Sequence, residues 1–267
     1  MKDGKEPAKR ASGLRPQSGA AAGEAAAEAG APGASEPRWG AVVVAAGRGT
    51  RMGTAESKQF LELGGKPLLI HSLELLQGMD EVAEIVLVTG ASDVERCRDW
   101  CRSYRLSKVA AVLEGGSERQ HSVRLGLRGL GTEWALVHDG VRPLVTAAAV
   151  RACLRRAEQT GAAVLAVPVK DTIKQADEHG VIVATPDRSS LWAIQTPQAF
   201  RRVRLLEAHE QALASGFLGT DDAMAVERLG DPVSVVEGEY TNIKITTPED
   251  LPYAEFLLAR RERGAES

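Results

Sequence analysis

The segment AVVVAAGRGTRMGTAESK, residues 41–58, decides the fold of this chain and points to its chemistry. Its first six residues are apolar, and together with Gly40 they predict a strand buried on both faces. Gly47 and Gly49 follow directly, and glycine permits backbone conformations in which N–H groups surround phosphate oxygens. The segment therefore predicts a strand that runs into a phosphate-binding loop. A plain strand-to-helix turn with solvated basic residues is the alternative.

Two common phosphate-loop motifs do not fit this loop. The dinucleotide fingerprint requires glycine at the sixth position of G-x-G-x-x-G, where this chain has Met52. The P-loop requires Ser or Thr after Gly-Lys, whereas Pro67 follows Lys66. The remaining possibility is a glycine loop that carries its own cations, Arg48, Arg51 and Lys58. Such cations suit a triphosphate whose charge rises on one phosphorus atom during displacement.

The composition excludes several classes of protein. Of the 267 residues, 43% are hydrophobic and 26% are charged, as in ordinary globular proteins. The net charge of −3 argues against a generic basic nucleic-acid surface, and no apolar run approaches the roughly 20 residues of a membrane span. The three cysteines cannot form a disulfide framework, and their odd number fits a reducing compartment. We expect a cytoplasmic protein without membrane or nucleic-acid partners.

Residues 1–37 differ from the rest of the chain. They include eleven alanines and six glycines, and Leu14 is their only large apolar residue after Met1. Such a segment cannot bury enough surface to offset its ordering entropy, which predicts a disordered extension. It lacks the apolar core of a signal peptide, and its acidic residues do not suit a transit peptide. We therefore expect one domain, at residues 38–267.

The body of the chain alternates short apolar runs with helical patterns. Strands are predicted at 40–46, 84–89, 109–113, 134–138, 162–168, 192–196 and 233–236. Helices are predicted at 67–76, 92–104, 118–130, 146–159, 200–215, 221–229 and 248–260. This order predicts an α/β fold, a Rossmann-like and mostly parallel sheet flanked by helices. Residues 170–191 interrupt it as a projecting β-arm, and the pattern fits a surface hairpin and a swapped dimer arm equally well.

Several motifs together resemble a known family. AAGRGTRMG with the later Lys58 resembles the nucleotidyltransferase signature of sugar-nucleotide pyrophosphorylases. Five further blocks follow in order: VHDGVRPLV at 137–145, VPVKDTIK at 167–174, LWAIQTPQAF at 191–200, TDDAMAVERLG at 220–230 and VEGEYTNIKITTPEDL at 236–251. Over about residues 39–262 the chain resembles the 2-C-methyl-D-erythritol 4-phosphate cytidylyltransferases of the non-mevalonate isoprenoid pathway. It departs from their pattern at Val44, where the family often has proline, and at Gly140-Val141, where the family often has Ala-Ala or Ala-Val.

The resemblance implies that a phosphate monoester oxygen attacks the α-phosphorus of CTP and that pyrophosphate leaves. The monoester is largely dianionic at neutral pH, so it needs no general base, and catalysis depends on positioning and neutralising two polyanions. The resemblance also implies Mg²⁺ or another divalent cation, and a homodimer formed through the β-arm. A sister family, the ribitol-5-phosphate cytidylyltransferases, shares most blocks, and no motif separates the two acceptors. A non-catalytic nucleotide-binding protein is a remoter alternative.

The resemblance assigns roles to individual residues. Arg51 and Lys58 correspond to groups that stabilise the transition state, and Arg188 and Lys244 to groups that hold the nucleophilic phosphate. A non-catalytic copy would be free to lose these four cations. The implied substrate-binding residues are Ala45, Ala46, Gly47, Gly49, Gly116, Ser117, Ser122, Asp139, Gly140, Arg142, Thr172, Thr196 and Thr220. If the arm is swapped, Thr172 and Arg188 come from the neighbouring subunit.

Four residues have a structural interpretation beside the functional one. Asp139 ends a predicted strand at the ligand edge of the sheet and is the expected carboxylate near Mg²⁺, directly or through water. Without the resemblance, an aspartate before Arg-Pro favours a loop salt bridge. Ser117 also suits the N-cap of the helix at 118–130. Cys97 and Cys101 are four residues apart on a predicted helix without further metal ligands, which favours packed side chains.

Overall fold

The computed structural model describes residues 39–47 and 57–265, which belong to the compact unit Glu36–Ser267. The predicted extension at 1–37 and two predicted site residues, Gly49 and Arg51, lie outside the described residues. None of the described helices combines the length and the apolar character that a membrane crossing requires.

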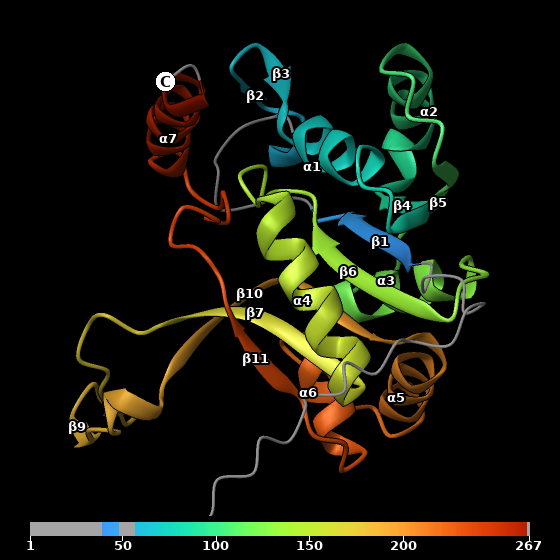
Figure 1. Cartoon of the computed structure of the whole chain (residues 1–267). Helices are drawn as coiled ribbons and strands as arrows, with labels where there is room; N and C mark the ends of the chain where they lie inside the picture. Colours follow the sequence, from blue (N-terminus) through green and yellow to red (C-terminus); the bar gives the residue numbers. More distant parts are fainter. Residues whose placement is uncertain (1–38, 48–56, 266–267) are drawn as a thin grey trace, which may run out of the picture. The chain divides into compact units, whose positions relative to one another are not determined.

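A seven-stranded sheet forms the centre of the described fold, in the order β11-β7-β10-β6-β1-β4-β5 (Figure 1). Six of these strands are parallel, and β10 is antiparallel to both of its neighbours. This confirms the predicted α/β fold with a mostly parallel sheet. The strands are β1 (Trp39–Ala45), β4 (Val82–Thr89), β5 (Val109–Glu114), β6 (Trp134–Asp139), β7 (Ala162–Pro168), β10 (Trp192–Arg201) and β11 (Ser234–Glu237).

Helices cover both faces of the sheet, as the continuous apolar strands predict. One face packs against α1 (Leu68–Gln77), α2 (Val94–Ser103) and α4 (Ala147–Thr160). The other packs against α3 (Arg119–Arg128), α5 (Arg202–Ala214) and α6 (Asp222–Arg228). A third, smaller core joins α7 (Asp250–Ala265) to the hairpin of β2 (Glu62–Leu63) and β3 (Lys66–Pro67).

Strand β1 shows why both faces are apolar. Val43 packs into the core beneath α1 and α4, whereas its neighbour Val42 packs into the core beneath α3. A Cβ atom on Gly126 of α3 would lie 2.4 Å from Val42 Cγ1. Glycine at this position therefore lets α3 approach the sheet closely, and this fixes the helix whose first turn reaches the candidate site.

The chain leaves β7, forms the arm and returns directly as β10. No crossover helix intervenes, so the returning strand runs antiparallel beside β7. The predicted helix at 200–215 therefore begins too early, because β10 continues to Arg201. Phe200 is buried and pairs with Ala135 of β6 and Ala162 of β7. Pairing on both sides overrides the local helical pattern.

The predicted arm is present as a separate two-stranded ribbon. Strands β8 (Gln175–Ala176) and β9 (Ile182–Ala184) pair antiparallel, and Figure 1 shows β9 well away from the main sheet. At the base of the arm, Val169 N–H donates to Leu191 O over 3.1 Å. The two ends of the arm are therefore joined where they leave the sheet.

Candidate active site

The carboxyl ends of β1, β5 and β6 bring three predicted segments to one edge of the sheet. Ala45 ends β1, Gly115 follows β5, and Asp139 ends β6. A Cβ atom on Gly115 would lie 2.5 Å from Ala46 Cβ, so only glycine allows the first two segments to approach this closely. Gln59 Nε2 donates to Ala45 O over 2.7 Å and holds the end of β1. This is the edge at which open α/β sheets bind ligands.

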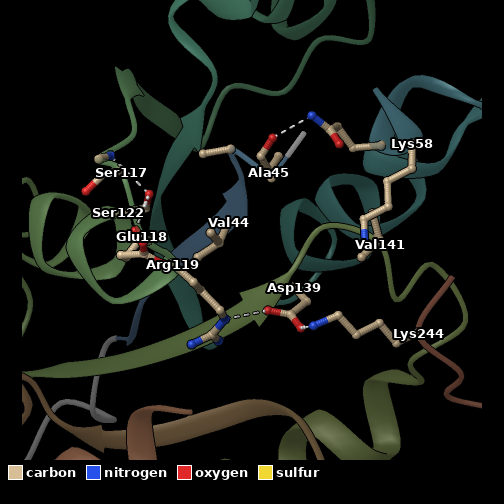
Figure 2. A pocket seen from close by; sticks show the side chains of 14 residues that line it. Val44, Ala45, Lys58, Ser117, Glu118, Arg119, Ser122, Asp139, Val141 and Lys244 are labelled. Atoms are coloured by element: carbon tan, nitrogen blue, oxygen red, sulfur yellow. Dashed lines mark hydrogen bonds and ion pairs between the residues drawn. The ribbon is translucent and has the colours of Figure 1, made fainter. Parts of the chain in front are cut away.

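A cavity of about 660 Å³ opens between these segments. Figure 2 shows Ser117 and Ser122 on one side of it and Lys58 on the other. The predicted site residues that line it are Ala45, Ala46, Gly47, Lys58, Gly116, Ser117, Ser122, Asp139 and Lys244. Its volume is in the range of small-molecule sites.

A second cavity of about 230 Å³ adjoins the first. Strand β10 and the loop before α6 contribute to its walls, and the predicted residues that line it are Asp139, Arg142, Thr196, Thr220 and Lys244. Arg119, Asp139 and Lys244 line both cavities. The structure thus brings most described candidates together around two adjoining spaces with one shared wall.

Asp139 lies in the shared wall between two cations. Arg119 Nε is 3.1 Å from Asp139 Oδ1, and Lys244 Nζ is 2.8 Å from Asp139 Oδ2 (Figure 2). Burial alone would raise the pKa of the Asp139 carboxyl, but the charges of Arg119 and Lys244 outweigh burial and hold that pKa well below its usual range. Asp139 is therefore a carboxylate at neutral pH, and it keeps both cations in the wall.

Arg119 is a site residue that the sequence interpretation missed. Its Nη2 donates to Asp222 Oδ2 over 2.9 Å, and Asp222 is fully buried in the first turn of α6. Arg119 precedes Ser122 by three residues on α3, and this spacing places the two side chains on one helix face. That spacing is the signal in the sequence that could have identified Arg119.

Lys244 is held in place through the backbone segment that carries it. Asn242 Nδ2 donates to Gln195 Oε1 and to Thr196 O, each over 3.0 Å. Arg142 Nη1 donates to Asn242 O over 2.7 Å. Arg142 and Asn242 are buried, so these bonds fix the chain two residues before Lys244.

Ser122 organises the second glycine segment. Gly116 N–H donates to Ser122 Oγ over 3.1 Å, and Ser122 Oγ donates to Glu118 O over 3.2 Å. The interpretation of Ser117 as a helix N-cap is wrong, because α3 begins one residue later and Glu118 occupies the cap position. Ser117 Oγ instead lies 3.1 Å from His121 Nδ1 and faces the larger cavity.

Three predicted residues lie outside both cavities. Thr172 and Arg188 belong to the exposed arm, where Arg188 Nη1 donates to Lys170 O over 2.7 Å. Gly140 is buried behind the wall, and a Cβ atom there would lie 2.8 Å from Leu69 Cδ1. Of the two residues in the second departure from the family pattern, Gly140 therefore affects packing against Leu69, whereas Val141 lines the larger cavity.

The cysteines are packed, as the sequence predicts. Cys97 and Cys153 are buried, and burial raises the pKa of the two thiols to about 11 and about 12, respectively. Among residues 39–47 and 57–265, no group of three or more His, Cys, Asp or Glu side chains is placed to hold a metal ion.

Comparison with known proteins gives one consistent family. The family model described as 2-C-methyl-D-erythritol 4-phosphate cytidylyltransferase matches residues 40–260. A curated protein of that name from Geobacillus kaustophilus is 52% identical over 223 residues, which cover 83% of this chain and 97% of the relative.

Solved structures give the same result. The 4-diphosphocytidyl-2C-methyl-D-erythritol synthase of Anaerococcus prevotii matches with a TM-score of 0.74 and 33% identity, over 84% of this chain and all of the other. The 2-C-methyl-D-erythritol 4-phosphate cytidylyltransferase of Thermus thermophilus matches with a TM-score of 0.68 and 35% identity, over 84% and 98% of the two chains. The chain therefore belongs to the 2-C-methyl-D-erythritol 4-phosphate cytidylyltransferase family.

Proposed function

We propose that this protein transfers CMP from CTP to 2-C-methyl-D-erythritol 4-phosphate in the synthesis of isoprenoid precursors. The products are 4-diphosphocytidyl-2-C-methyl-D-erythritol and pyrophosphate. The observation that carries this proposal is the wall of Asp139, Arg119 and Lys244, which borders a large and a small cavity at once. Two anionic substrates of unequal size can occupy the two cavities and meet at this wall.

The reaction is a displacement at phosphorus. An oxygen of the acceptor phosphate forms a bond to the α-phosphorus of CTP, and the bond from that phosphorus to the bridging oxygen of the β-phosphate breaks. Pyrophosphate leaves with the electron pair of that bond. The attacking oxygen already carries negative charge at neutral pH, so the protein's task is to align the substrates and to stabilise charge in the transition state.

We assign the larger cavity to CTP. The backbone from Ala45 to Gly47 lies at the end of β1, where N–H groups can bind phosphate oxygens. Lys58 lines the same cavity and would place its ammonium beside the triphosphate. Arg51, predicted from the resemblance, would add a second cation at the α-phosphorus. Gly116, Ser117 and Ser122 would frame the ribose and cytosine on the opposite side.

We assign the smaller cavity to the acceptor. Arg142, Thr196 and Thr220 line it, and the exposed Thr220 hydroxyl would bind a polyol hydroxyl. Lys244 lines both cavities and would hold the nucleophilic phosphate next to the α-phosphorus. The acceptor then lies between the wall and strand β10.

A divalent cation fits this arrangement as a ligand of the substrate. Mg²⁺ takes one or two protein carboxylates together with phosphates and waters, and Asp139 supplies such a carboxylate at the edge of the larger cavity. Mg²⁺ bound there would neutralise phosphate oxygens of CTP. Because both Asp139 oxygens already face cations, this carboxylate is suited to contact through a water molecule.

The arm is proposed to complete the site of a second subunit. It exposes Val181, Ile182 and Val183, whose side chains are 59%, 59% and 62% accessible, and a contiguous apolar surface of this kind favours association. Thr172 and Arg188 lie on the same arm, outside this chain's own two cavities. In a homodimer they would reach the partner's acceptor and bind its phosphate.

We also propose that the enzyme acts in the cytoplasm.

The test is pyrophosphate release with CTP and Mg²⁺, comparing 2-C-methyl-D-erythritol 4-phosphate with D-ribitol 5-phosphate at equal concentration. We expect a strong preference for the branched tetritol phosphate. A preference for ribitol phosphate would retain the cytidylyltransferase chemistry and contradict the proposed acceptor. No release with either acceptor would contradict the proposed reaction.

A further inference from the structure

A line of charged and polar side chains extends from the shared wall into the protein interior. Asp139 contacts Arg119, and Arg119 contacts Asp222. Behind them, His209 Nε2 lies 3.1 Å from Asp222 Oδ1. Asp222 and His209 are almost completely buried, at 0% and 1% exposure, and neither of them lines a cavity. They therefore have no direct access to substrate.

Both carboxylate oxygens of Asp222 and its backbone N–H make hydrogen bonds. One carboxylate oxygen accepts from Arg119 Nη2 and the other from His209 Nε2–H, while the backbone N–H donates to Gln198 Oε1 over 3.1 Å. Burial alone would raise the pKa of the Asp222 carboxyl, but the charge of Arg119 and the hydrogen bond from His209 lower it. A buried carboxylate held this rigidly defines the position of the cation that it binds.

Resting on the proposed function, we propose that Asp222 is a positioning residue for the transfer reaction. It holds the guanidinium of Arg119 in the wall between the two cavities, and His209 holds Asp222. Without the second carboxylate, Asp139 alone would balance the charges of both Arg119 and Lys244. Arg119 would lose one of its two anchors, and the wall would lose the arrangement in which both substrates are aligned.

A purely structural role for Asp222 makes a different prediction. Asp222 also lies in the first turn of α6, where a negative charge stabilises the helix. If this were its whole contribution, its loss would lower stability and would affect catalysis equally whether or not Arg119 is present. A double-mutant cycle on kcat and KM separates the two roles.

The experiment compares wild type, Asp222→Asn, Arg119→Ala and the double variant with CTP and 2-C-methyl-D-erythritol 4-phosphate. Asparagine preserves the shape of Asp222 and removes its charge. We expect Asp222→Asn alone to lower kcat by about 30-fold, with a change of less than about threefold in KM for CTP. In the Arg119→Ala background the same substitution should lower kcat by less than about threefold. Equal losses in both backgrounds would overturn the proposal.

Glu210→Gln is the matched control. Glu210 neighbours His209 on α5 and pairs with Arg124 and Arg128 of α3, so its loss removes ion pairs between the helix of His209 and the helix of Arg119. It lines neither cavity. We expect this variant to keep kcat within about twofold of wild type. A 30-fold loss there would assign the effect to helix packing and contradict the positioning role.

A second pair of variants serves if Asp222→Asn does not fold. His209→Leu removes the donor to Asp222, whereas His209→Gln retains one. We expect the leucine variant to lower kcat by about fivefold and the glutamine variant to recover most of that loss. Equal kcat in the two variants would contradict the role of His209. Absence of wild-type activity would instead contradict the proposed function itself.

Discussion

His138 gives a prediction about stability that can be worked out from its contacts. It lies on β6 beside Asp139 and is 1% exposed. Asp139 N–H donates to Thr196 Oγ1 over 3.0 Å, and Thr196 Oγ1 lies 3.2 Å from His138 Nδ1. His138 Nε2 lies 3.3 Å from Arg142 O, which can only accept, so Nε2 carries the proton of the neutral ring and Nδ1 accepts from the Thr196 hydroxyl. This set of bonds suits the neutral imidazole, whose Nδ1 lone pair accepts the hydroxyl proton of Thr196.

The lowered pKa of His138 determines how the free energy of unfolding changes with pH. Burial lowers the pKa of His138 from 6.5 to about 4, despite the opposing charge of Asp139. Between these values the unfolded chain binds a proton that the folded chain does not, so stability falls as pH decreases. For this single group the free energy of unfolding should fall by about 2 kcal/mol between pH 7 and pH 5, and by about 3 kcal/mol by pH 4.

The measurement is urea unfolding at pH 7 and pH 5, at one protein concentration, for wild type and His138→Gln. Glutamine does not titrate and keeps a donor toward Arg142 O. The variant is expected to lose about 2 kcal/mol less than wild type over this interval. His179→Gln removes an exposed imidazole on the arm and serves as the control. If wild type and His138→Gln lose the same free energy within about 0.5 kcal/mol, the reasoning about His138 is wrong.

Three further predictions concern catalysis and assembly. Lys58→Ala should lose most of kcat while CTP binding by calorimetry remains measurable, because the ammonium acts mainly on transition-state charge; near-normal kcat would contradict this role. Ile182→Asp should shift the protein toward the monomer in analytical ultracentrifugation and lower activity, because it puts a charge on the exposed apolar arm; an unchanged, active dimer would contradict the arm interface. Deletion of residues 1–36 should leave kcat/KM nearly unchanged, and a tenfold loss would show that the extension takes part in catalysis.

The strands of this fold could be predicted from the sequence because a buried parallel strand requires an unbroken apolar run. Residues 40–46 predict β1, and the strand is Trp39–Ala45. The second half of β10 could not be predicted in this way. Its residues Gln198 to Arg201 have no local strand signal, and only pairing with β6 and β7 keeps them extended.

The same division applies to the site. Asp139 could be predicted because it ends a strand and a parallel sheet brings its carboxyl ends to one edge, whereas Gly116 is predicted from the family resemblance. The contact of Arg119 with Asp222 joins residues 103 positions apart on different helices, and no local pattern contains it. The assigned roles of Thr172 and Arg188 depend on a second subunit and remain predictions.

The joined base of the arm has a consequence for how this enzyme can change over evolution. Val169 and Leu191 are hydrogen-bonded to each other, and the strand pairing resumes at Pro168 and Trp192. The two ends of the arm are therefore joined at the edge of the main sheet, and strands β8 and β9 beyond this base form a separate sheet. In the proposed homodimer, changes between residues 170 and 190 would alter the subunit interface and the acceptor contacts of Thr172 and Arg188, while the main sheet keeps its strand pairing. On that proposal, selection would act on assembly and substrate choice separately from the core fold.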